Sequence, residues 1–144
     1  MVVRGERLTE NEKKKEYLNS YKNLCKKIKS LECQLEELRE SKSSVQAMVI
    51  DDMPKGTNQS DLSDYMVKVD ELEAEIKKTR QECLDRKLEI EHCIVVVKDG
   101  VESAILHKRY IELKDWTVIA VEINYSWRQT HYIHSRALRN FTYK

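Results

Sequence analysis

Apolar residues recur every three or four positions along the first part of the chain. The first series advances by steps of 4, 3, 4, 3, 4 and 3 and consists of Tyr17, Tyr21, Leu24, Ile28, Leu31, Leu35 and Leu38. Lys, Glu and Gln occupy most of the positions between them. This heptad pattern predicts an amphipathic helix over about residues 9–42. Thr9 and Glu12 have the spacing of a capping box, which places the helix start.

A second heptad series predicts another long helix, over about residues 61–97. Its members are Leu62, Tyr65, Val69, Leu72, Ile76, Thr79, Cys83, Arg86, Ile90, Cys93 and Val97. The intervening residues 43–60 contain the only Pro and one of the three Gly residues, and they predict a loop. Two apolar seams joined by a loop predict an antiparallel coiled-coil hairpin. Leu84 and Leu88 lie off the main seam, and the sequence leaves open whether they form, with Tyr65 and Met66, a second apolar strip for a partner or a second copy.

After Gly100 the heptads give way to three short amphipathic segments. The first, over residues 101–113, carries Val101, Ala104, Ile105, Tyr110, Ile111 and Leu113. The second begins after Asp115, a potential N-cap, and repeats apolar residues at i, i+3, i+4 and i+7: Trp116, Ile119, Ala120 and Ile123. Ser126 and Gln129 have capping-box spacing at the start of the third. This last helix, with its recognition part over residues 126–140, is expected to bury Thr130, Ile133, Ala137, Leu138 and Phe141.

The second and third segments have the spacing of a helix-turn-helix. Ala120 lies inside the first helix, and Asn124 follows four positions later as a turn residue that tolerates a left-handed conformation. Tyr125, Thr130, Ile133 and Ala137 then fall one, six, nine and thirteen positions beyond it. The predicted fold is therefore all-α, with a helical hairpin over residues 1–97 and a three-helix helix-turn-helix domain over residues 98–144.

Composition agrees with long helices and offers no sign of an enzyme. Charged residues make up 35% of the 144-residue chain, whereas Gly and Pro are rare. Neither a Gly-rich phosphate loop nor a His matched with a nucleophile and a carboxylate is found, so no catalysis and no cofactor are expected. The four cysteines, Cys25, Cys33, Cys83 and Cys93, form no CxxC pair, so no metal site is expected. With no signal-peptide pattern and no apolar span, we expect a cytoplasmic protein that does not contact a membrane.

The charge distribution points to a polyanionic partner. The formal net charge is only +1, but from Ile123 onward the chain contains three Arg, one Lys, two His and no Asp or Glu. A basic, acid-free segment that coincides with a predicted recognition helix indicates double-stranded DNA.

Side chains on the outer face of this helix are the candidate DNA contacts. Arg128 and Gln129 are residue types that read guanine and adenine edges in the major groove. An exposed Trp127 beside them favours a contact surface. Arg136 and Arg139 are expected to meet phosphates, which anchor without specifying sequence. The full candidate set is Trp127, Arg128, Gln129, His131, Tyr132, Ser135, Arg136 and Arg139.

Several of these motifs resemble the C-terminal domain, region 4, of bacterial sigma factors. The matching residues are Arg109-Tyr110, Trp116, Ile119-Ala120, Tyr125-Ser126 and Arg136-Ala137-Leu138. Asn124 replaces the usual turn Gly, and Thr117-Val118 replaces an acidic pair. The whole chain is similar to small phage and prophage proteins related to ArpU/RinA-type transcriptional regulators, a group often catalogued only as domains of unknown function. The resemblance implies a phage-type regulator, with RNA polymerase as a further partner.

Two other functions remain compatible with the sequence. A phage DNA-packaging protein, similar to a terminase small subunit, also combines a helix-turn-helix with oligomerising helices. A purely structural coiled-coil interaction protein would use the terminal helices only to cap the hairpin. Ring-like assembly would favour the first alternative, and lack of salt-sensitive DNA binding would favour the second.

Overall fold

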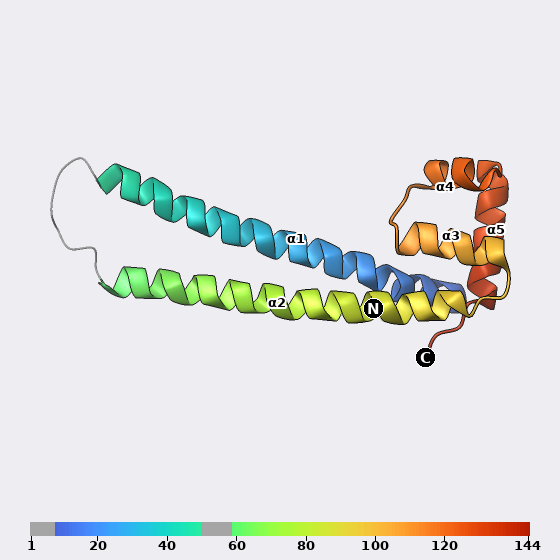
Figure 1. Cartoon of the computed structure of the whole chain (residues 1–144), viewed down its shortest axis with the longest axis horizontal. Helices are drawn as coiled ribbons and strands as arrows, with labels where there is room; N and C mark the ends of the chain where they lie inside the picture. The colour runs from blue at the N-terminus through green and yellow to red at the C-terminus, as the bar shows by residue number, and fades with distance from the viewer. Residues whose placement is uncertain (1–7, 50–58) are drawn as a thin grey trace, which may run out of the picture. The chain divides into compact units, whose positions relative to one another are not determined.

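The computed structural model describes residues 8–49 and 59–144, and every regular element in these ranges is a helix (Figure 1). The elements in chain order are α1 (Glu10–Val49), α2 (Gln59–Val95), α3 (Gly100–Tyr110), α4 (Trp116–Ile123) and α5 (Trp127–Asn140). The predicted all-α class, a long helical hairpin followed by three short helices, is confirmed.

Helix α1 begins where the sequence predicted but extends further. The Thr9 backbone N–H donates to Glu12 Oε2 (2.7 Å), and the Glu12 N–H donates to Thr9 Oγ1 (3.3 Å), which completes the capping box. The predicted loop start at residue 43 was wrong, because α1 continues to Val49. Neither Gly nor Pro occurs between residue 43 and Val49, and Ser lowers helix stability only slightly. The predicted turn at Pro54 and Gly56 lies outside the described residues.

Helix α2 and helix α3 also differ from the predicted bounds. Helix α2 begins at Gln59, inside the predicted loop, and ends at Val95 rather than at residue 97. Helix α3 ends at Tyr110, so the helix predicted through Leu113 was too long. Leu113 instead adopts a positive φ of 56° and is 38% exposed. The turn is closed by a bond from the Lys114 N–H to the Lys108 carbonyl oxygen (3.0 Å).

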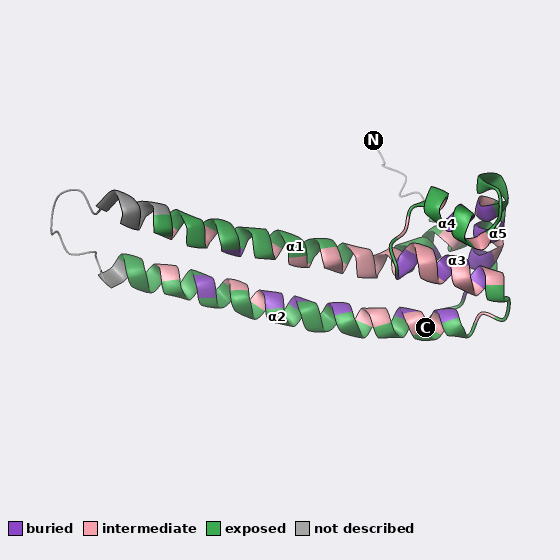
Figure 2. Cartoon of the chain, turned by 45° about the horizontal axis from the view of Figure 1, so that its top comes forward, coloured by how far each residue is buried: buried purple, intermediate pink, exposed green. Residues whose placement is uncertain are grey.

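The chain divides into two compact units, and the first consists of the described residues within Leu24–Glu82. Leu35, Val69 and Ile76 form its buried core, flanked by the half-buried Leu31, Leu38, Tyr65 and Leu72. Figure 2 shows buried positions recurring along α2, and in this unit they are members of the predicted seam.

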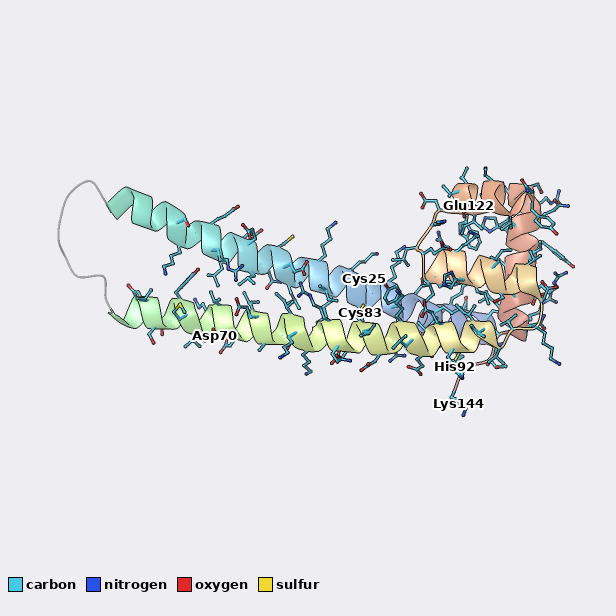
Figure 3. All side chains as sticks on the ribbon, viewed as in Figure 1. Cys25, Asp70, Cys83, His92, Glu122 and Lys144 are labelled. Atoms are coloured by element: carbon cyan, nitrogen blue, oxygen red, sulfur yellow. The ribbon has the colours of Figure 1, made fainter. Side chains whose placement is uncertain are left out.

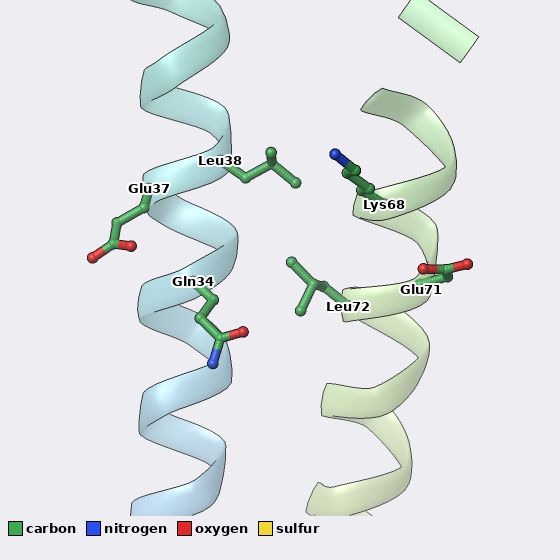
Figure 4. Close-up of a pocket in the computed structure, with 6 residues that line it drawn as sticks. All are labelled: Gln34, Glu37, Leu38, Lys68, Glu71 and Leu72. Atoms are coloured by element: carbon green, nitrogen blue, oxygen red, sulfur yellow. The ribbon is translucent and has the colours of Figure 1, made fainter. Parts of the chain in front are cut away.

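Ion pairs across this unit join the two helices in antiparallel register. Arg39 pairs with Glu73 (2.8 Å), and Glu32 pairs with Arg80. Residue numbers therefore increase along α1 as those of the facing residues decrease along α2. These groups are well exposed and contribute little to stability. Near Leu38 and Leu72 the helices leave an open groove (Figure 4), which is also lined by Gln34, Glu37, Lys68 and Glu71.

The second unit comprises the described part of Met1–Asn23 together with Cys83–Lys144. It therefore unites the end of each hairpin helix with all of α3, α4 and α5. Its main core consists of Leu18, Ile90, Ile94, Leu106, Tyr110, Ile111, Ala137, Leu138 and Phe141. Leu18 and Ile94 lie outside the predicted heptad seams. The buried face is wider here because α1 and α2 pack against α3 and α5 as well as against each other.

Lys14 attaches α1 to the C-terminal end of α5. Its side chain is buried, and its ammonium donates hydrogen bonds to the carbonyl oxygens of Leu138 (2.9 Å) and Arg139 (3.3 Å). The last carbonyls of a helix lack partners within the helix and carry partial negative charge, so an ammonium satisfies them well. Tyr17 adds a stacking contact with Tyr143, with ring centroids 4.4 Å apart. The C-terminal end of the predicted recognition helix is therefore fixed on the first part of α1.

Candidate nucleic-acid interface

The turn between α4 and α5 has the geometry that the sequence predicted. Asn124 is in the left-handed region (φ 59°, ψ 37°), and the Tyr125 N–H donates to the Ala120 carbonyl oxygen at 3.1 Å. This bond is the one that closes a Schellman motif. At the start of α5 the Gln129 N–H donates to Ser126 Oγ (3.1 Å), and the Ser126 N–H donates to Gln129 Oε1 (3.3 Å). The predicted capping box is confirmed, and it fixes where α5 begins.

The inner face of α5 is also as predicted. Thr130, Ile133, Ala137, Leu138 and Phe141 are all buried. The Thr130 hydroxyl donates to the Ser126 carbonyl oxygen (2.8 Å), so this polar group is satisfied in the core. Ile133 packs with Ile105 of α3 and Ile119 of α4. Because this face is held by two other helices, the side chains on the opposite face of α5 are directed to solvent.

Five of the eight candidate side chains are on the outward face. Trp127 is 59% exposed and Tyr132 is 65% exposed, and Arg128, Ser135 and Arg139 are also exposed. Four of these, Arg128, Tyr132, Ser135 and Arg139, follow each other at i, i+4, i+7 and i+11 and form one stripe along the helix. Within the described residues neither Arg128 nor Arg139 forms an ion pair with a carboxylate. No described carboxylate therefore competes with an external anion for either guanidinium group.

The other three candidates have partners within the protein. Gln129 is exposed but serves the capping box. His131 lies between two aromatic rings, with centroid distances of 4.5 Å to Trp116 and 4.0 Å to Trp127. Partial burial, with a smaller effect from Arg109, lowers the pKa of the His131 imidazole. The Arg136 guanidinium binds Glu102, so its charge is balanced inside the unit.

Glu102 is a buried carboxylate that sequence analysis missed. Only 2% of it is exposed, and it accepts hydrogen bonds from Arg136 Nε (2.6 Å) and from Asn140 Nδ2 (3.0 Å). Asp99 caps the same end of α3, accepting from the N–H groups of Val101 (2.9 Å) and Glu102 (3.0 Å). The bond from the Glu102 N–H is the main reason that the pKa of Asp99 is lowered. A single Glu in a charged sequence resembles a surface residue, and only its spacing relative to the buried Ile105 and Leu106 could have indicated otherwise.

His134 is a second buried polar residue that the sequence did not identify. It is 5% exposed, and its Nε2 lies 2.7 Å from the Tyr110 hydroxyl oxygen. The rings of Trp116 and His134 pack in a T-shaped arrangement, with centroids 4.5 Å apart and an interplanar angle of 68°. Burial is the main cause that lowers the pKa of His134 to about 3, and it also raises the pKa of Tyr110 to about 12. Both groups are therefore neutral at neutral pH.

The acidic residue nearest to the turn is neutralised by α3 and the loop after it. Glu122, labelled in Figure 3, accepts hydrogen bonds from Lys108 Nζ and Lys114 Nζ, each at 2.8 Å. The hydrogen bond from Lys108, followed by that from Lys114, holds the pKa of Glu122 below its ordinary value. The basic character of α5 is thus not offset by an unpaired carboxylate at this end of α4.

Apolar side chains border α5 on the side of the turn. Val121 is 72% exposed, and it lines a shallow groove together with Thr117, Ala120, Asn124, Tyr125 and Trp127. Among the described residues, no cluster of His, Cys, Asp and Glu has the arrangement of a metal site, and no cysteine forms a disulfide. No described helix combines the length and apolar character needed to cross a membrane.

A family described as "Protein of unknown function (DUF1492)" matches residues 41–141, which is well over half of the chain. The chain belongs to the DUF1492 family. Comparison with curated proteins and with solved structures gives no match. The region shared with DUF1492 contains all of α2 to α5, so the candidate interface and the packing of α3 and α4 behind it lie within the family's common sequence.

Proposed function

We propose that this DUF1492 protein is a sequence-specific DNA-binding transcriptional regulator in which α5 enters the major groove. The observation that supports this most strongly is the outward stripe of α5. It presents Arg128, Tyr132, Ser135 and Arg139 on a helix that is capped at Ser126 and backed by α3 and α4. No Asp or Glu occurs from Ile123 onward, so a phosphate backbone would meet no repulsion from side chains of this segment.

The two arginines of the stripe have different roles in this proposal. Arg128 is in the first turn of α5, which lies nearest the base edges when a recognition helix docks by its N-terminal end. Its forked guanidinium suits the O6 and N7 atoms of guanine. Arg139 is in the last turn and is placed to contact a phosphate. Arg136 is a weaker candidate than the sequence suggested, because Glu102 already binds it.

The resemblance to sigma factor region 4 and to phage regulators extends this proposal. It suggests regulation of phage or prophage genes, with the hairpin contacting RNA polymerase or a second copy of the chain. The same interface would also serve a DNA-packaging protein. Subunit number separates the two functions: a monomer or dimer fits a regulator, whereas a ring of eight or more subunits fits a packaging protein.

Selection of bound fragments from a random duplex pool by the full chain tests DNA recognition directly. We expect enrichment of one sequence element and an affinity that falls steeply with salt. A footprint of about four phosphate contacts predicts a log–log slope of roughly −3 to −4. A slope near zero, or no binding at low salt, would exclude this function and favour a structural coiled-coil protein. Light scattering on the same preparation gives the subunit number.

A further inference from the structure

Two large aromatic side chains are exposed beside Arg128 on α5. Trp127 and Tyr132 are 59% and 65% exposed, although both are large enough to contribute substantially to a core. Tyr132 is in the same stripe as Arg128, and Trp127 lies to one side of it. The surface that faces the proposed major groove is therefore partly apolar.

The Trp127 ring is held in place before any ligand binds. It contacts His131 with ring centroids 4.0 Å apart, and His131 in turn contacts Trp116 at 4.5 Å. Trp116 is fixed by Arg109, whose guanidinium carbon lies 4.8 Å from the ring centroid. A side chain ordered in advance loses less conformational entropy on binding than a mobile one. These ring contacts thus position the apolar face of Trp127 at the N-terminal end of α5, which is the end nearest to the bases in the proposed complex.

Thymine offers an apolar group that can pack against such an aromatic ring. Its 5-methyl group projects into the major groove, whereas the other base-edge groups there are hydrogen-bond donors and acceptors. The cations in the same stripe and the absence of Asp and Glu from Ile123 onward favour DNA over a protein surface as the source of this apolar contact.

We infer that Trp127 and Tyr132 determine specificity by contacting thymine methyl groups next to a guanine that Arg128 reads. This inference rests on the proposed DNA-binding function. Trp127 and Tyr132 are five residues apart, which is about 7.5 Å along α5 and about 140° around its axis, so the two rings lie on opposite sides of Arg128. The recognised element therefore contains two thymines within about three base pairs of the guanine.

Replacement of thymine by uracil tests this contact, because it removes the methyl group and retains base pairing. The full chain is titrated, at one fixed salt concentration, against its selected duplex and against duplexes with a single uracil at each thymine. For the wild-type protein we expect about a two- to fivefold loss of affinity at each contacted thymine. Trp127→Ala should bind the thymine duplex more weakly and show no further loss at one of these positions. Tyr132→Ala should behave in the same way at the other.

Two further variants show whether the effect comes from the aromatic rings. Tyr132→Phe removes only the hydroxyl group and should keep the uracil effect. Leu88→Ala removes an exposed apolar side chain (56% exposed) on α2 and should also keep it. Since Trp127 and Tyr132 are exposed, their variants should melt cooperatively, as circular dichroism can verify.

The outcomes separate this inference from the function on which it rests. If the wild-type protein selects one element with a steep salt dependence but binds all uracil duplexes equally well, the inference is wrong and DNA recognition stands. Loss of the uracil effect in Tyr132→Phe would show that Tyr132 acts through its hydroxyl group, which also contradicts the inference. If the chain selects no DNA sequence at all, the proposed function fails and the inference fails with it.

Discussion

At the scale of single residues, the arginines of α5 differ in what they already bind. Arg128 and Arg139 are exposed, whereas Arg136 is bound to the buried carboxylate of Glu102 through Nε. The sequence places all three in one basic segment and gives no reason to separate them. Their separation depends on a residue of α3 that lies 34 positions earlier in the chain. The consequence is a different expected phenotype for each substitution.

Substitution of the two exposed arginines should separate base reading from anchoring. Arg128→Ala should cost about 1–3 kcal/mol of binding free energy on the selected element and much less on random DNA. Arg139→Ala should weaken binding to both duplexes alike and reduce the magnitude of the salt slope by about one unit. Fluorescence anisotropy titrations on the two duplexes at several salt concentrations measure both effects. An equal loss on every sequence for Arg128→Ala would mean that Arg128 is an anchor and not a reader.

Arg136→Ala should instead act mainly on folding. Among the described residues, the substitution leaves Asn140 as the one hydrogen-bond partner of the buried Glu102 carboxylate. A buried charge without its counter-ion is strongly unfavourable. We expect the melting temperature to fall by roughly 5 °C or more. The double variant Arg136→Ala, Glu102→Gln should regain part of this loss because its buried group is neutral, and Arg139→Ala should melt close to the wild-type protein. A normal melting temperature for Arg136→Ala would show that Glu102 does not depend on this pair.

At the scale of helices, the sequence predicted the starts of α1 and α5 and the turn before α5 better than the other helix bounds. The capping boxes at Thr9 and Ser126 and the left-handed turn at Asn124 are all present. Each depends on residues within five positions of one another, so local spacing is sufficient to predict it. The buried face of α5 was also predictable because its apolar residues repeat with the helical period.

The features that the sequence did not predict depend on distant partners or on weak local signals. Lys14 resembles its exposed neighbours Lys13 and Lys15, and only the position of the end of α5 explains why it is buried. Glu102 on α3 is a second example, because its hydrogen-bond partners Arg136 and Asn140 lie on α5. The end of α1 was misplaced because a Ser-rich segment indicates a helix end only weakly.

The contact between Lys14 and α5 should be measurable as stability. In Lys14→Met the apolar stem is largely retained, but the carbonyl oxygens of Leu138 and Arg139 lose their donor. We expect a loss of about 1–3 kcal/mol in the free energy of unfolding, measured with urea. Lys13→Met is the matched control, because Lys13 is exposed one position earlier, and it should change stability by less than about 0.5 kcal/mol. Equal stabilities for the two variants would show that the ammonium group contributes nothing to holding α5.

At the scale of the whole molecule, the first part of α1 and the last part of α2 share one hydrophobic core with α5, which carries the candidate interface. Leu18 of α1, Ile90 and Ile94 of α2 and Leu138 of α5 belong to the same buried cluster. The outward stripe of α5 is therefore presented by a unit that includes the first part of α1 and the last part of α2. Substitutions in this core should lower apparent DNA affinity only by reducing the fraction of protein that is folded. Substitutions of Arg128 should instead lower the affinity of the folded protein.

The buried His134 makes the stability of the second unit depend on pH. Because the pKa of His134 is about 3 in the folded state, well below the ordinary value of 6.5, the fold disfavours the charged imidazole. Between these two pH values the unfolded chain binds more protons than the folded chain, so stability must fall as pH decreases from about 6.5 toward 3. Lys15, His131 and Arg109 act in the same direction, since each opposes an additional positive charge. From pH 7 to pH 4, this one group should account for a loss of roughly 2–3 kcal/mol in the free energy of unfolding.

The variant His134→Gln tests this, because it retains a hydrogen-bonding group for Tyr110 but does not titrate. Its free energy of unfolding, measured with urea, should fall by roughly 2–3 kcal/mol less than that of the wild-type protein between pH 7 and pH 4. His92→Gln, at an exposed position on α2, should follow the wild-type curve. Parallel curves for the wild-type protein and His134→Gln would mean that other groups, such as the capping carboxylate of Asp99, cause the acid sensitivity.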